Sequence, residues 1–134
     1  MIIKRKLGYI VPINPIPEIK NGREHYTFDE PFAFYELYMP LDDTEALETY
    51  GDTINRYLKM FPKYSEWYGK IKPNDRAYLI DAETTEEDIE NLINSDNKYR
   101  LKANYKVVVV APQNLRMKIH FKKITEGDKE NEWC

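Results

Sequence analysis

The fold of this chain is decided by residues 104–124, which read NYKVVVVAPQNLRMKIHFKKI. In the second half of this stretch apolar and basic side chains alternate: Leu115, Met117, Ile119 and Phe121 lie between Arg116, Lys118, His120 and Lys122. A period of two is typical of a β-strand with one solvated face. The first half, 105–110, is mostly β-branched, and its run from Val107 to Val110 has no polar alternation, which predicts a strand covered on both faces.

Between the two halves lies Ala-Pro-Gln-Asn, 111–114. Proline presets φ for the first central position of a turn, so this segment predicts a turn that joins an antiparallel hairpin. In a chain this short, a strand covered on both faces is expected inside a small β-barrel or sandwich. We therefore predict a mainly β fold, with residues 1–124 forming a single domain.

The N-terminal 1–31 should hold an arm and the first strands, because 12–17 contains three prolines, which leave fewer backbone donors for a sheet. Asn21-Gly22 is a turn signal. Further strands are expected at 32–39, 53–60 and 76–80, helical turns after Asp42 and at 64–68, and a flexible polar tail at 125–134.

An acidic helical insertion is predicted at 83–97, with the helix itself at about 84–94. Thr84 and Glu87 have capping-box spacing, and Ile89, Leu92 and Ile93 follow at helical intervals. Residues 83–96 hold six acidic and no basic side chains, whereas 98–123 hold eight basic and no acidic ones. The charges are therefore segregated along the chain.

The amino-acid composition argues against several classes of protein. The 134 residues are 42% hydrophobic and 32% charged, which is ordinary for a globular domain. The single cysteine, Cys134, excludes a disulfide framework, and no apolar run is long enough to span a bilayer. These features favour an intracellular protein that makes no membrane contact, and the net charge of −3 argues against a protein built mainly to grip phosphates.

We expect no enzymatic activity, cofactor or metal. The two histidines are isolated; His120 is expected to be exposed on the polar face of the hairpin, and Asp42-Asp43 suits a helix cap better than a pair of catalytic carboxylates. The five glycines match no phosphate-binding loop.

The candidate protein-interface residues are charged or large aromatic side chains: Glu86, Glu87, Glu90, Arg116, Lys118, Lys122, Tyr57 and Trp67. Segregated acidic and basic patches can join copies of one chain head to tail in a ring. Alternatively, Lys106 together with the basic residues of the hairpin could follow a nucleic-acid backbone, with Tyr57 or Tyr105 stacking on bases.

Three segments carry a family resemblance: ETYGDTINR at 48–56, IKPNDRAYLID at 71–81 and ANYKVVVVAPQNLRMKIHFKKI at 103–124. The chain from about 35 to 124 resembles the small head–tail connector proteins, also called head-closure or stopper proteins, of tailed phages that infect Gram-positive hosts. The shared motifs are structural and include no catalytic fingerprint.

The resemblance implies an SH3-like β-barrel that forms a ring in the phage neck, assembled in the host cytoplasm. Its partners would be other copies of itself, the portal or adaptor protein, and the tail terminator or tail-tube protein, with only passive contact with DNA. The insertion at 83–96 would lie in the channel or between rings. Two alternatives stay open: a small β-barrel that binds nucleic acid, and a phage-encoded inhibitor that mimics charge through its acidic helix.

Overall fold

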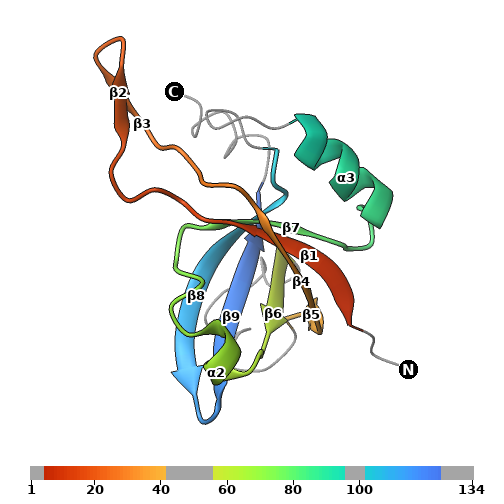
Figure 1. The fold of residues 1–134 in the computed structure, drawn as a ribbon. Helices are drawn as coiled ribbons and strands as arrows, with labels where there is room; N and C mark the ends of the chain where they lie inside the picture. The colour runs from red at the N-terminus through yellow and green to blue at the C-terminus, as the bar shows by residue number, and fades with distance from the viewer. Residues whose placement is uncertain (1–4, 42–55, 96–101, 125–134) are drawn as a thin grey trace.

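The computed structural model describes residues 5–41, 56–95 and 102–124, and these form a mainly β protein (Figure 1). One antiparallel sheet has the strand order β4-β1-β7-β8-β9-β6-β5. Its strands are β1 (Lys6–Val11), β4 (Phe32–Glu36), β5 (Tyr38–Pro40), β6 (Tyr57–Met60), β7 (Arg76–Leu79), β8 (Tyr105–Gln113) and β9 (Arg116–Lys123). A separate hairpin pairs β2 (Glu18–Lys20) with β3 (Arg23–His25), and the helices are α2 (Tyr64–Trp67) and α3 (Glu86–Ser95).

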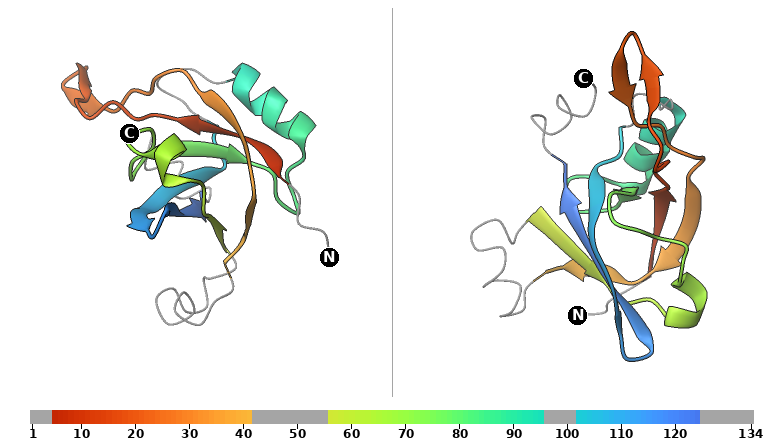
Figure 2. Two further views of the ribbon diagram at one scale, coloured as in Figure 1. Left: turned by 60° about the horizontal axis from the view of Figure 1, so that its bottom comes forward. Right: turned by 90° about the vertical axis from the view of Figure 1, so that its left-hand side faces the viewer.

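The seven-stranded sheet curves strongly but is not a closed barrel, so the prediction of barrel closure is wrong (Figure 2). The strands at its two ends, β4 and β5, do not pair with each other. They follow one another in the chain, separated only by Leu37, and pair with β1 and β6 respectively. The two ends of the sheet are therefore joined by the backbone at Leu37, where a barrel would have a ladder of hydrogen bonds.

The main core lies inside this curve. Ile10, Tyr38, Leu79 and Phe121 are among its fully buried side chains, and Trp67 of α2 closes it with an edge contact to the ring of Phe34. Gly8 faces the same ring, and a Cβ atom at this position would collide with it. The predicted helical turn that carries Trp67 is thus confirmed, and it covers one side of the main core.

The predicted hairpin is confirmed as β8–β9, but its turn is displaced. Pro112 belongs to β8, and the chain reverses at Asn114, whose φ of 58° lies in the left-handed region. Leu115, expected on the buried face, is instead a turn residue with 86% of its surface exposed. Proline is tolerated in β8 because β7 pairs only with the first two residues of that strand, so Pro112 lies at a sheet edge.

A register shift between Val107 and Val109 explains the partial burial of the valine run. Val107 is fully buried in the main core, whereas Val108 is half-buried and packs beside Leu41 and Tyr57 in a small separate cluster. A bulge of this kind redirects side chains locally. The prediction that both faces are covered therefore holds completely only at Val107.

The acidic helix is confirmed as α3, and its cap lies one residue later than expected. The backbone N–H of Asp88 donates to Thr85 Oγ1 at 3.2 Å, and the Thr85 N–H donates to Asp88 Oδ2 at 2.9 Å. Ile89 is fully buried against Tyr78 and Val11, on the face of the sheet that points away from the main core. Thus α3 covers the outer face of β1 and β7.

The Pro-rich arm, residues 12–17, leads from β1 to the β2–β3 hairpin, which projects from the body of the protein (Figure 1). Its base is fixed by a bridge between Ile13 and Phe28. Asn21 and Gly22 both have positive φ, as the predicted turn requires. The helical turn predicted after Asp42, the start of the 53–60 strand, the end of the 83–97 insertion and the 125–134 tail lie outside the described residues.

Candidate interaction site

Three basic residues stand side by side on adjacent strands. Arg76 of β7 pairs with Lys106 of β8, and Lys106 pairs on its other side with Lys122 of β9. Residues directly opposite in a sheet share a face, with Cβ atoms about 4.5–5.5 Å apart. We call Arg76, Lys106 and Lys122 the cation row. Like charges placed directly opposite one another destabilise a sheet, so the row costs the isolated domain stability.

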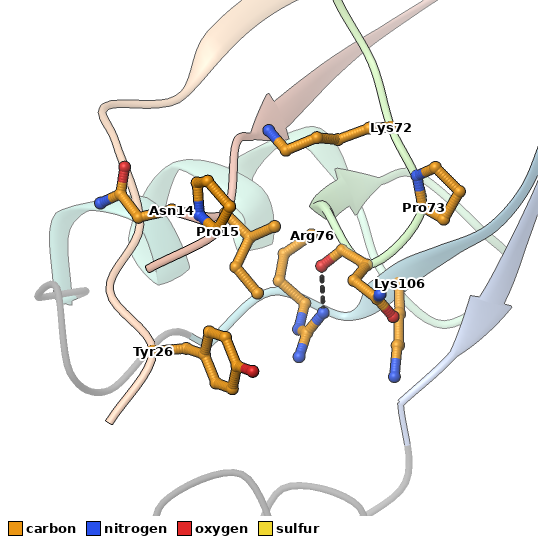
Figure 3. Close-up of a pocket in the computed structure, with 9 residues that line it drawn as sticks. Asn14, Pro15, Tyr26, Lys72, Pro73, Arg76 and Lys106 are labelled. Carbon is orange, nitrogen blue, oxygen red and sulfur yellow. Dashed lines mark hydrogen bonds between the residues drawn. The ribbon is translucent and has the colours of Figure 1, made fainter. Parts of the chain in front are cut away.

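Two members of the cation row, Arg76 and Lys106, line a pocket of about 470 Å³ (Figure 3). Lys72 lines it as well, so the three side chains give the pocket three positive charges. The remaining lining residues are polar or apolar but uncharged: Ile13, Asn14, Pro15, Tyr26, Pro73 and Asn74. The walls come from the Pro-rich arm, the loop before β7, and β8, segments far apart in the sequence. We call this the basic pocket.

Asp75 holds the two halves of the basic pocket together. Its buried carboxylate accepts hydrogen bonds from the backbone N–H groups of Ile13 and Lys72, both at 3.0 Å. Lys72 Nζ also lies 3.4 Å from Asp75 Oδ1. The carboxylate therefore ties the Pro-rich arm to the loop before β7, and its charge is directed at Lys72.

Arg76 is held rigidly at the pocket wall. Its Nη1 donates to the carbonyl oxygen of Asn74, and its guanidinium lies 5.3 Å from the centroid of the Phe28 ring. A cation over an aromatic face is attracted by the ring quadrupole, so both contacts fix the orientation of the planar group. Arg76 is buried, which leaves Lys72 and Lys106 as the more accessible cations.

On α3, the predicted interface residues Glu86, Glu87 and Glu90 are all exposed. Within the described part of the chain, neither they nor Lys106 and Lys122 form an ion pair. Acidic side chains in the first turn complement the helix dipole, but Glu90 lies beyond that turn and one helical turn from Glu86. The structure thus presents an acidic helix face and a cation row on separate elements.

The other predicted basic residues lie nearer the end of the β8–β9 hairpin. Arg116 is exposed, and its Nη1 donates to the Phe61 carbonyl oxygen at 3.3 Å. Lys118 is half-buried two pairs further along β9. His120, expected to be exposed, has only 7% of its surface accessible because β6 and β8 flank it on both sides. Of the basic residues predicted from the sequence, Lys106 and Lys122 belong to the cation row, whereas Arg116 and Lys118 do not.

The predicted aromatic interface residues are interior residues. Trp67 is 6% exposed and Tyr57 is 8% exposed, so their rings stabilise the fold and offer almost no surface to a partner. Tyr105 is buried as well, and its hydroxyl donates to Asp81 Oδ2 at 2.8 Å. None of these rings is available for stacking on a base.

Asp81 forms the centre of a network at the base of the β8–β9 hairpin. Burial alone would raise the pKa of its carboxyl, but hydrogen bonds from Tyr105, from the Glu83 N–H and from Lys123 together lower that pKa. Lys123 Nζ also lies 2.9 Å from Glu83 Oε2. Burial raises the pKa of Tyr105, and hydrogen bonding to Asp81 raises it further. This network fastens the end of β7 to the hairpin.

Lys72, Arg76, Asn14 and Tyr26 were not among the residues singled out from the sequence. Arg76 and Lys106 are 30 positions apart, and only the strand register brings them together. The one sequence signal for Arg76 was a basic residue at the start of a predicted strand, and nothing in the sequence paired that strand with the one that contains Lys106.

Comparison with family models, with curated proteins and with solved structures finds no match to this chain. In the parts of the chain that the structure describes, no helix is long and apolar enough to cross a membrane. Within the same residues, no cluster of histidine, cysteine or carboxylate side chains has an arrangement that could hold a metal ion.

Proposed function

We propose that this protein is a structural component of a phage neck, where copies of it form a ring that closes the packaged head and joins it to the tail. The observation that carries the proposal is the projecting arm with its exposed apolar side chains. Ile16 is 80% exposed, Ile19 76% and Tyr26 52%. Apolar surface gathered on a projection is typical of a protein–protein contact.

The β2–β3 hairpin forms a two-stranded sheet of its own, with three residues in each strand. A two-stranded hairpin without further packing is only marginally stable in water. Docking onto a second polypeptide would bury Ile16 and Ile19 and would order the hairpin. An arm that embraces the neighbouring copy is also what the resemblance to phage connectors implies.

The further partners in this proposal are the portal or adaptor protein on one side of the ring and the tail terminator or tail-tube protein on the other. Contact with DNA would be passive, because the net charge of −3 disfavours tight binding to a phosphate backbone. The exposed acidic face of α3 would lie between copies, where it can meet the basic surface of a neighbour.

A nucleic-acid-binding protein is the second candidate, and the cation row is the observation that favours it. The row could follow a phosphate backbone. This candidate lacks stacking platforms at the predicted positions, because Tyr57 and Tyr105 are buried. The charge-mimicking inhibitor stays a prediction, supported only by the exposure of Glu86, Glu87 and Glu90.

The decisive experiment removes the gene from the phage that encodes the chain and examines the particles by negative-stain electron microscopy. We expect heads without tails that lose their DNA, and recovery of infectious particles when the wild-type chain is supplied in trans. Tailed particles of normal shape in the absence of the protein would refute a neck function.

The arm is tested in the same assay with the double variant Ile16→Ser, Ile19→Ser, which we expect to fold normally but to fail in complementation. Leu115→Ser is the matched control, since Leu115 is equally exposed but lies at the turn of the β8–β9 hairpin. Equal complementation by both variants would exclude the arm from assembly.

A further inference from the structure

We propose that the basic pocket and cation row of one copy bind the carboxylates of α3 in a neighbouring copy. The inference deepens the proposed function and rests on it, because it specifies a contact through which copies assemble. The ligand class is a pair of carboxylates presented about one helical turn apart. The acceptor is formed by Lys72, Arg76, Lys106 and Lys122.

The first argument is the unfavourable charge arrangement of the isolated chain. Three cations directly opposite one another on adjacent strands repel, and within the described residues Lys106 and Lys122 have no acidic partner. The carboxylate of Asp75, next to Arg76 in the chain, is directed at Lys72 and at two backbone N–H groups. An incoming anion would relieve this repulsion.

The second argument is spacing. On a helix, side chains three or four positions apart have Cβ atoms about 5–6 Å apart. Glu86 and Glu90 are four apart, and Glu87 and Glu90 are three apart, all on exposed positions. Cations on adjacent strands have nearly the same separation, about 4.5–5.5 Å. Two carboxylates of one α3 can therefore meet two neighbouring members of the cation row at once.

The third argument is the shape and chemistry of the acceptor. The pocket volume of about 470 Å³ admits carboxylate side chains, and its walls of proline and tyrosine exclude some of the water that would screen the charges (Figure 3). Arg76 is held in place by Asn74 and Phe28 and adds positive potential at the pocket wall, while the more accessible Lys72 and Lys106 can meet the acidic groups.

Carboxylates from this chain fit better than the phosphates of a nucleic acid. A nucleic-acid strand has a negative charge on every nucleotide, so the field of a chain with net charge −3 opposes its approach more strongly than that of a second copy. Within the described residues, the exposed glutamates of α3 form no ion pair, and neither do Lys106 and Lys122 of the row. The acidic face of α3 and the cation row are therefore complementary in charge.

The test uses the full-length chain and charge reversal. We expect wild-type protein to self-associate at low salt, as measured by sedimentation velocity over a range of concentrations, and to dissociate at high salt. Lys106→Glu, and separately the double variant Glu86→Lys, Glu90→Lys, should each weaken self-association by about tenfold or more. An equimolar mixture of the two variants should regain association, because the unchanged acidic helix of the Lys106→Glu chain can bind the unchanged basic pocket of the double variant.

Lys63→Glu is the matched control, since Lys63 is an exposed lysine at the start of α2 and away from the pocket lining. It should associate as the wild type does. Thermal unfolding checks the fold, and Lys106→Glu should melt at or above the wild-type temperature because it removes the repulsion within the row.

Failure of the mixture to associate would overturn the inference, and so would a wild-type chain that stays monomeric at every concentration. Salt-sensitive binding of a DNA oligonucleotide that is lost in Lys106→Glu but kept in the α3 variant would assign the pocket to phosphate instead. If the mixture fails while particles without the protein still lack tails, the neck function stands and only this contact falls.

Discussion

The two hairpins of this protein are built on similar turns and have opposite roles. The β8–β9 hairpin reverses at Asn114 and the β2–β3 hairpin at Asn21, with φ of 58° and 55°. The first lies between β7 and β6 and supplies much of the main core. The second has no neighbouring strand, and almost all of it is exposed. Turn chemistry makes a hairpin, but burial decides whether it stabilises the domain or extends from it.

The largest loss of stability should come from truncating a core side chain of β9. Phe121→Ala should lower the free energy of unfolding by about 3–5 kcal/mol, because the fully buried ring leaves a cavity. Ile19→Ala in β2 should change it by less than about 0.5 kcal/mol. Urea unfolding measures both, and similar losses would show that the arm belongs to the same cooperative unit.

The next largest loss of stability should come from Asn104→Ala. The buried side chain of Asn104 accepts a hydrogen bond from the Leu79 N–H at 3.0 Å and donates to the Leu79 carbonyl at 2.8 Å, acting as a strand partner for the end of β7. Its loss should cost about 2–3 kcal/mol, since two backbone groups are left unpaired. Asn14→Ala in the arm loses one bond, to Thr27 at 2.8 Å, and should cost less; the reverse order in chemical denaturation would contradict this assignment.

A matched pair of turn substitutions compares how strongly each hairpin contributes to the global stability of the domain. Asn114→Ala should lower global stability by about 1 kcal/mol, because alanine tolerates the left-handed region less well than asparagine does. Asn21→Ala has the same local cost, but it should only speed amide hydrogen exchange within β2–β3. Equal shifts in melting temperature would mean that the arm unfolds together with the core.

The smallest effect is a pH dependence confined to the base of β8–β9. The pKa of Asp81 is lower in the folded protein than the usual value near 3.8, so its ionised form stabilises the fold above about pH 4. That contribution is lost as pH falls through the lowered folded pKa. Asp81→Asn should remove this part of the acid dependence in melting curves recorded from pH 6 to about pH 3. An unchanged acid slope in the variant would show that the network contributes nothing.

Local patterns predicted the local elements well. The alternation of 115–122, the spacing of Ile89, Leu92 and Ile93, and the Asn21-Gly22 turn each depend on a few neighbouring residues, and each element is present. The displaced turn at Asn114 shows the limit, because Pro112 suits a turn in isolation and is allowed in β8 only by the lack of a neighbouring strand beside it.

The interaction site was predicted only in part, for a physical reason. The exposed acidic face of α3 follows from composition and helical spacing, which are local properties. The cation row depends on the register of three strands, and the basic pocket depends on Asp75 drawing the Pro-rich arm to the loop before β7. The burial of Trp67, Tyr57 and His120 likewise depends on long-range packing, and a large aromatic or basic residue gives no local sign of it.

The proline in β8 has a consequence for how the protein behaves when it is crowded. Met117 donates its N–H to Pro62, away from β8, so the backbone of its partner Pro112 faces the unpaired edge of the sheet. An ordinary residue there would offer an amide to any extended chain that came alongside. Proline offers none, and the edge is a poor template for amyloid-like stacking. At this edge of β8, a neighbouring copy therefore finds one backbone donor fewer for pairing its own strand.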